Sequence, residues 1–205
     1  AVEPTTRDTL LSLERLKVEL RFWKLLKKEV EIEEISIRNA TFDTRDFIDG
    51  VVVSGHLGEL FLESHGVVFS PETARINEFS VKNTDVSLTL GSIESTDTVP
   101  SEPLYWKILL DEIDFENVGF ALKMPQDSLF VRTMLPKTTL KNGVIDLKEA
   151  SYYVKSFGID NAELAYGPKE ELFLQQIGLQ LDSIYYCGKD IRANIEEFVL
   201  KERSG

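Results

Sequence analysis

Two short segments, SGH and SHG, hold the side chains best suited to nucleophilic chemistry. In them Ser54 stands two positions before His56, and Ser64 directly precedes His65. A serine hydrolase also needs a placed acid, and in one large class the serine sits in a G-x-S-x-G turn. Neither segment has these features. We therefore interpret both histidines as residues at strand ends and expect a protein that is not an enzyme.

Metal and phosphate chemistry have no better support. His56 and His65 lie nine positions apart and Cys187 is distant, which does not make a cluster of metal ligands. The GHLG and NG segments open no helix that could bind a phosphate. Glu33 and Glu34 fit a solvated face, and no pair of carboxylates stands out for glycoside chemistry. The sequence therefore predicts no catalytic residue, no metal site and no cofactor.

The composition is that of a folded, acidic protein. Of 205 residues 42% are hydrophobic, which allows a substantial core, and the formal net charge is −12 at pH 7. Nucleic acids bind basic surfaces, and this sequence offers only the short KLLKK segment. No apolar run approaches the roughly 18 residues of a membrane-spanning helix. Because the chain lacks a signal peptide and a first Met, we expect residues 1–205 to be one segment of a longer protein.

Residues 16–42 predict the elements that organise the chain. Apolar and charged residues alternate over residues 16–22, the period-2 pattern of a half-buried strand. Residues 23–28 are rich in Lys and Leu and predict one or two helical turns. The strand that follows changes the parity of its apolar residues at Glu33 and Glu34, which indicates a bulge.

Other strand patterns and turn signals surround this unit. Residues 91–103 are polar, contain two prolines and predict a long exposed loop. Two short strands separated by glycines are expected within residues 51–69. The remaining expected strands cover residues 8–14, 106–124, 129–135, 138–147, 152–166, 172–186 and 191–200.

Five segments share one local pattern, in which an apolar residue, a charged residue, Asn and two variable residues precede another apolar residue. They are ISIRNATF, FSVKNTDV, IDFENVGF, TTLKNGVI and FGIDNAEL, with the asparagines Asn39, Asn83, Asn117, Asn142 and Asn161. The two apolar residues are always five positions apart, and regular alternation would place them on opposite faces. Asn tolerates left-handed backbone angles, so a bulge there would return both residues to one face.

Two geometries fit this repeat: a long strand bent at each Asn, or a two-residue hairpin centred on it. We favour the bent strand because separate turn signals supply the reversals, and we allow a hairpin at Asn142, which Gly143 follows. The predicted fold class is all-β, an antiparallel meander of bent strands that forms an open U-shaped groove, with one short helical turn near the N-terminus. A closed sandwich or barrel fits the pattern equally well.

The order of these segments resembles a known family. The strand, KLLKK turn and strand, followed by I-x-I-x-N-x-x-F, is similar to the amino-terminal region of AsmA-like proteins, and above all to the TamB (translocation and assembly module) group of Bacteroidetes. Landmarks that agree are DTLLSLERLKVEL, SGHLGELFLESHGV, PLYWKILLDEIDFENVGFALKMPQDSL, LKNGVIDL and VKSFGIDNAELAYG. The resemblance covers residues 8–166 and rests on the order and number of these motifs.

This resemblance implies a periplasmic protein of Gram-negative bacteria, anchored in the inner membrane by an amino-terminal helix, whose strands form an apolar groove. It implies phospholipid transport between the two membranes and outer-membrane biogenesis, with an outer-membrane barrel as partner. It carries over no catalytic motif. We expect phospholipid acyl chains to contact a groove lined by Val81, Val86, Leu88, Phe115, Phe120, Leu122, Ile145, Leu147, Phe157, Ile159, Leu164 and Tyr166.

Two other functions fit the same pattern. Exposed strand edges of an open meander could accept a strand from an unfolded outer-membrane protein, which would make the chain an assembly scaffold. A closed β-sandwich would instead be a binding module without a role in lipid transport.

Limited proteolysis tests the predicted loop. Residues 91–103 contain few apolar side chains, so we expect a broad-specificity protease to cut there first. Mass spectrometry of the early fragments locates the cut. First cleavage within residues 138–166 would contradict the prediction, because it would mean that the ordered strands are misplaced.

Overall fold

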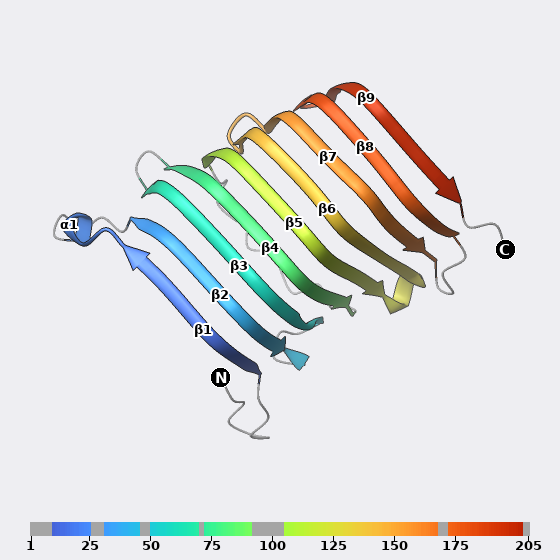
Figure 1. Cartoon of the computed structure of the whole chain (residues 1–205), viewed down its shortest axis with the longest axis horizontal. Helices are drawn as coiled ribbons and strands as arrows, with labels where there is room; N and C mark the ends of the chain where they lie inside the picture. The colour runs from blue at the N-terminus through green and yellow to red at the C-terminus, as the bar shows by residue number, and fades with distance from the viewer. Residues whose placement is uncertain are drawn as a thin grey trace.

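A computed structural model describes residues 10–25, 31–45, 50–69, 72–91, 105–167 and 172–202. These residues form one nine-stranded sheet in which the strands follow one another in sequence order (Figure 1). The sheet is open, with β1 at one edge and β9 at the other. The strands are β1 (Leu11–Leu20), β2 (Ile32–Asp43), β3 (Val51–Phe69), β4 (Glu72–Leu90), β5 (Lys107–Met124), β6 (Leu129–Asp146), β7 (Ser151–Tyr166), β8 (Leu172–Cys187) and β9 (Asp190–Glu202).

The predicted all-β open sheet of bent strands is confirmed, with one departure in topology. Strands β4 and β5 pair in parallel, whereas the other neighbouring strands pair antiparallel. A parallel neighbour requires a long connection back to the starting edge of the sheet. That connection contains the predicted loop, and residues 92–103 of the loop lie outside the described residues.

Three predicted strand breaks are absent. Residues 51–69 form the single strand β3, with its glycines inside it, and β6 runs unbroken through Pro136. Residues 11–20 likewise form one strand, β1, where two were expected. The predicted helical turn is present as α1 (Phe22–Leu25), and residues 26–28 of the predicted turn lie outside the described residues. The expected bulge near Glu33 is also present, because Glu19 pairs with Glu34 whereas Leu20 pairs with Ile32.

The five repeated asparagines mark bends within strands. Their φ angles lie between 48° and 53°, in the left-handed region, and each Asn is inside a strand. The bent-strand geometry is therefore correct, and the hairpin allowed at Asn142 is wrong. In β4, Val81 and Val86 lie on either side of Asn83, and their partners in β5 are Phe115 and Phe120. Both apolar residues of a repeat thus stay on one face, as the bulge predicts.

The bends of neighbouring strands line up across the sheet. Lys82 and Thr84 flank Asn83, and they pair with the two residues that flank Asn117. The next strand places Pro136 at this level, because Lys137 and Leu135 pair with the same two flanking residues of β5. A proline lacks the N–H of a regular ladder and is tolerated at such an irregular position. The side-chain amide of Asn117 donates a hydrogen bond to Asn83 Oδ1 at 3.2 Å along this row.

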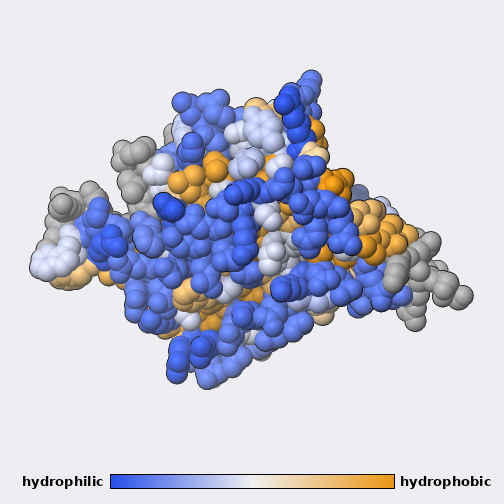
Figure 2. All heavy atoms as spheres, turned by 45° about the horizontal axis from the view of Figure 1, so that its top comes forward, coloured by the Kyte–Doolittle hydropathy of each residue, from blue (hydrophilic) through white to orange (hydrophobic). Residues whose placement is uncertain are grey.

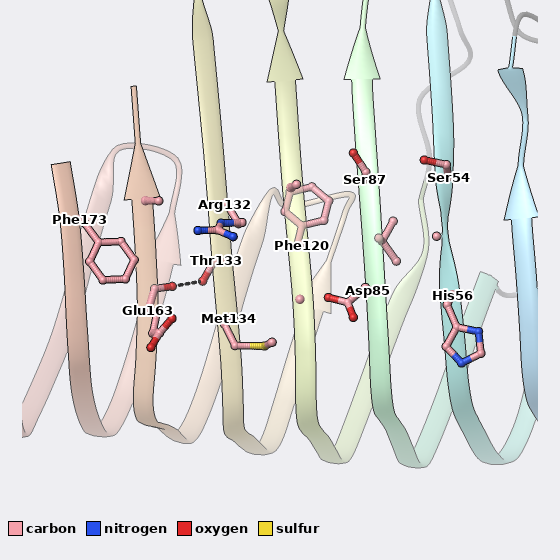
Figure 3. Close-up of a pocket in the computed structure, with 15 residues that line it drawn as sticks. Ser54, His56, Asp85, Ser87, Phe120, Arg132, Thr133, Met134, Glu163 and Phe173 are labelled. Carbon is pink, nitrogen blue, oxygen red and sulfur yellow. Dashed lines mark hydrogen bonds between the residues drawn. The ribbon is translucent and has the colours of Figure 1, made fainter. Parts of the chain in front are cut away.

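Asn142 belongs to a second row of bends. Its neighbours Lys141 and Gly143 pair with the residues on either side of Asp111 in β5. In β4, the neighbour of β5 on its other side, Asn77 Nδ2 donates a hydrogen bond to Asp111 Oδ2 at 3.1 Å. The strands therefore bend at two levels, which gives the sheet its U-shaped course. Figure 3 shows the strands turning back at the foot of the view and continuing behind their own first arms.

The sheet curves around its apolar face. At the first row of bends Thr84 and Ala162 are buried on that face, although no second layer of described elements covers it. Their neighbours on the other face, Glu59 and Glu116, are exposed. Buried side chains at the bend on one face, with exposed charged side chains opposite, are expected where a layer curves toward the first face. The apolar face is therefore the inside of the U.

A ladder of alternating charges crosses the outer face beside the first row of bends. Lys82 Nζ lies 3.3 Å from Glu116 Oε2, and from β2 to β7 each pair of cross-strand neighbours in the ladder has opposite charges. Opposite charges that face each other across strands stabilise a pair by roughly 0.2–1 kcal/mol and disfavour a shifted register. The ladder consists of Arg38, Glu59, Lys82, Glu116, Lys137 and Asp160.

Substitution of Gly58 tests the packing at the first row of bends. A Cβ on Gly58 would lie 2.5 Å from the carbonyl oxygen of Asn83, so the backbone of one strand must move. We expect Gly58→Ala to lower the free energy of unfolding by about 1–3 kcal/mol. Gly178→Ala is the control, since its nearest neighbour, Val199 Cβ, would be at 3.5 Å. Equal midpoints of urea unfolding for the two variants would contradict this account.

Asn117 tests the left-handed bend itself. Glycine adopts φ near 52° without a steric penalty, whereas a β-branched residue does not. We expect Asn117→Val to cost about 1–2 kcal/mol of unfolding free energy relative to Asn117→Gly. Urea unfolding followed by circular dichroism compares the two variants. If the valine variant is as stable as the glycine variant, the backbone angle is not what limits this position.

Candidate functional site

The inner face of the sheet carries rows of apolar side chains that cross all nine strands. One such row joins cross-strand partners from Leu16 in β1 to Phe198 in β9. Thr138 is its only polar member. Its full membership is Leu16, Ile37, Leu60, Val81, Phe115, Thr138, Ile159, Leu179 and Phe198.

Eleven of the twelve predicted lining residues lie on this inner face. The cross-strand pairs Val86 with Phe120 and Leu88 with Leu122 occupy one arm of the U. Leu164 and Tyr166 continue these two rows in β7. The others are Val81, Phe115 and Ile159 in the row described above, Phe157 in the adjacent row, and Ile145 in the second arm. As residues that contact lipid, all of them remain predictions.

Leu147 is the exception, because it lies in the turn after β6. Its N–H donates a hydrogen bond to the carbonyl oxygen of Trp106 at 3.0 Å, which fixes the backbone at the margin of the sheet. The residue is therefore placed at the rim of the U and not along its inner wall.

Several inner-face residues were missed by the sequence analysis. Phe79 and Phe115 make an edge-to-face contact with ring centroids 6.2 Å apart, and Leu140 lies on the same face. The alternation of apolar residues predicts these positions once it is followed separately on each side of the Asn in a strand. The missed members of one row are Val18, Ile35, Leu62, Phe79, Ile113, Leu140, Leu181 and Ile195.

Tyrosines stand at both rims of the inner face. Tyr152 and Tyr186 are cross-strand partners with ring centroids 5.5 Å apart, at the end of the second arm. Tyr166 stands near the end of the first arm and is exposed. A tyrosine has an apolar ring and a polar hydroxyl, which suits a border between apolar surface and water.

Thr138 is a polar side chain in the middle of the apolar face. It is buried, and its Oγ1 has no hydrogen-bond partner among the described residues. By contrast, Thr133 Oγ1 on the same face and strand donates to the carbonyl oxygen of Glu163 at 2.9 Å. A buried hydroxyl without a partner lowers stability, so packing alone does not explain Thr138.

A depression of about 340 Å³ lies over the first arm, and residues of both faces line it, among them Phe120 and Thr133 of the inner face and Arg132 of the outer face (Figure 3). It lies over Gly119 and Ala121, whose small side chains leave room between larger neighbours. Asp85 leans toward this space, since a Cβ on Gly119 would collide with Asp85 Oδ1. Polar residues such as Ser54 and Arg132 surround the depression.

His56 borders this depression. Its cross-strand partner in β4 is Asp85, yet the contact that its ring makes is with Thr41, at 3.5 Å between Oγ1 and Nδ1. His65 hydrogen-bonds to Asn77 on the other arm. Both histidines therefore lie within β3 and not at strand ends as predicted.

Charged side chains on the outer face form ion pairs at the surface. Hydrogen bonds to Glu19 and Glu34 raise the pKa of Lys17, and a hydrogen bond to Glu112 raises the pKa of Lys141. Both lysines thus keep their positive charge at neutral pH. Figure 2 shows this hydrophilic surface, with hydrophobic side chains gathered toward the end of the molecule that holds the C-terminus.

The described residues hold no group of three His, Cys, Asp or Glu side chains that could bind a metal ion. Within the same residues, no helix has the length and hydropathy needed to cross a membrane. The sequence matches no protein-family profile and no curated protein.

Proposed function

We propose that this chain is a segment of a periplasmic, inner-membrane-anchored protein that conducts phospholipid along its apolar β groove and supports outer-membrane biogenesis. One observation supports the proposal most: the inner face of an open sheet is apolar across nine strands and no described element covers it. The resemblance of the motifs to AsmA-like proteins supports the location and the cargo. The proposed role is non-catalytic.

The proposed mechanism is partition of acyl chains onto the inner face. Each methylene group removed from water contributes about 0.8 kcal/mol, so a single acyl chain gains substantial free energy along the groove. Contacts with apolar side chains are non-directional, so a chain can slide without a fixed site. The polar head group stays in water at the rim, where Tyr152, Tyr186 and Tyr166 stand.

The assembly-scaffold alternative has support from a different feature, the outer edge of β9, which pairs with no further strand among the described residues. Such an edge presents backbone N–H and C=O groups to any extended strand. The closed sandwich considered from sequence is wrong, because the described strands form one open sheet.

A carboxylate within the groove tests the lipid proposal. Phe120 has 38% of its surface exposed, so Phe120→Asp should remain folded, with its charge in contact with water. Leu164→Asp, in the same cross-strand row, is a second variant. Ala121→Asp is the matched control, because it places the same charge on the outer face opposite Arg132.

Each protein is incubated with phosphatidylethanolamine and phosphatidylglycerol vesicles and re-isolated, and mass spectrometry of an organic extract counts the bound lipid. We expect the parent and Ala121→Asp to carry lipid and both groove variants to lose it several-fold, while circular dichroism shows cooperative melting for all four. A parent chain without lipid would refute the proposal. Folded groove variants with undiminished lipid would show that Phe120 and Leu164 do not line the path.

A further inference from the structure

Five of the six tyrosines of the chain lie at one rim of the U. Each is within two residues of a strand end: Tyr105 precedes β5, Tyr152 and Tyr153 follow the start of β7, and Tyr185 and Tyr186 precede the end of β8. These strand ends are neighbours in the sheet, because they pair in one row across β5, β6, β7 and β8. We call this row, with the turns beyond it, the second-arm rim; its strand ends are Lys107, Asp146, Ser151 and Cys187.

The tyrosines surround the second-arm rim on both faces. Tyr152 and Tyr186 are on the inner face, and the residues beside them, Tyr153 and Tyr185, pair with each other on the outer face. Tyr153 and Tyr185 have 38% and 41% of their surface exposed. Tyr and Trp are enriched at the level of the lipid head groups in membranes, because the ring is apolar and the polar atom reaches water. The second-arm rim therefore has the composition of such an interface.

The opposite rim, at the end of the first arm, has a different composition. Four of the five strand ends from β4 to β8 are aliphatic there, and one is a tyrosine. They are Leu90, Met124, Leu129, Tyr166 and Leu172. Aliphatic side chains suit contact with hydrocarbon and offer no hydrogen bond to a head group. The two rims are therefore not equivalent surfaces for a lipid.

Charges of both signs alternate along the second-arm rim. Lys107 Nζ lies 3.8 Å from Asp146 Oδ2, and each of the next two described turns at this rim carries an exposed lysine followed by a carboxylate. These turn residues are Lys148, Glu149, Lys189 and Asp190. A zwitterionic head group has a phosphate for the lysines and an ammonium group for the carboxylates. An anionic head group has no positive group for these carboxylates, and the chain as a whole, with a net charge of −12, repels it.

We propose that the second-arm rim binds the head group of a zwitterionic phospholipid, so that lipid lies in the groove in one orientation. This inference rests on the proposed function, since it places the head group of the lipid that the groove would conduct. The phosphate lies near the lysines of the rim, and the rings of Tyr152 and Tyr186 contact the glycerol region. The acyl chains extend from there into the U, where the inner faces of both arms can contact them.

Matched single-tryptophan variants test this orientation. Trp23 and Trp106, the two tryptophans of the chain, are replaced by Phe, after which Tyr152→Trp reports on the second-arm rim and Tyr166→Trp on the opposite rim. The two sites are comparable, because Tyr152 and Tyr166 are 40% and 49% exposed on the inner face. Each protein is incubated with phosphatidylcholine vesicles whose nitroxide is on the choline head group or at the end of an acyl chain. The protein is then re-isolated, mass spectrometry counts the bound lipid, and nitroxide quenching of the fluorescence reports contact.

We expect the head-group nitroxide to quench the Tyr152→Trp variant several-fold more strongly than the Tyr166→Trp variant, and the acyl-end nitroxide to show no such preference for the second-arm rim. Bound lipid whose head-group label quenches both variants equally, or Tyr166→Trp more, would overturn the orientation and leave lipid conduction standing. Absence of bound lipid would overturn both proposals.

A second measurement tests the class of head group. The parent chain is re-isolated from vesicles of equimolar phosphatidylethanolamine and phosphatidylglycerol at low salt, and we expect the extracted lipid to be several-fold enriched in phosphatidylethanolamine. Because the preference is electrostatic, it should weaken as the salt concentration rises. An extract with equal amounts of the two lipids, or with more phosphatidylglycerol, would contradict the assignment of a zwitterionic head group.

Discussion

The left-handed asparagine is the constraint on which this sheet depends. A regular strand alternates strictly, so residues five positions apart point to opposite faces. One residue with φ near 50° removes that conflict at Asn39, Asn83, Asn117 and Asn161, and a second row of bends contains Asn142. Because the bends of neighbouring strands lie at the same level, they add up to a crease across the sheet. Without the crease, the apolar residues of each strand would be divided between the two faces and the groove would not exist.

A single curved layer has an unusual balance of stabilising interactions. The strands pair through continuous ladders, and curvature buries side chains such as Val81 and Leu181 on the concave face without a second layer. The charge ladder on the convex face favours one register. Most of the inner surface is still exposed to solvent. Exposed apolar patches of this kind commonly mark a binding surface for an apolar ligand or partner. The net charge of −12 favours solubility of a chain with such a surface.

Much of this architecture follows from local sequence patterns, and the exceptions have physical reasons. The bulge near Glu33 and the Asn bends were predicted because each changes the parity of apolar residues within a few positions. The parallel pairing of β4 and β5 was not predicted, because a strand has the same alternation in either direction. Pro136 was taken as a break, but it lies at a bend whose position is set by Asn117 on the neighbouring strand. Leu147 has the right residue type and parity, yet the turn begins before it.

The aligned bends also mean that different features of the sequence determine the cross-section of the groove and its length. The profile depends on how many residues separate the two rows of bends along one strand, for example from Pro136 to Asn142 in β6, and this spacing must match in adjacent strands. The length depends only on how many strands lie side by side. Loss of one residue between two bends would therefore disturb every neighbouring strand, whereas gain or loss of a whole hairpin would leave the cross-section unchanged. Insertions and deletions should consequently be tolerated in the connections, or as complete strand pairs, and excluded from the intervals between the bends.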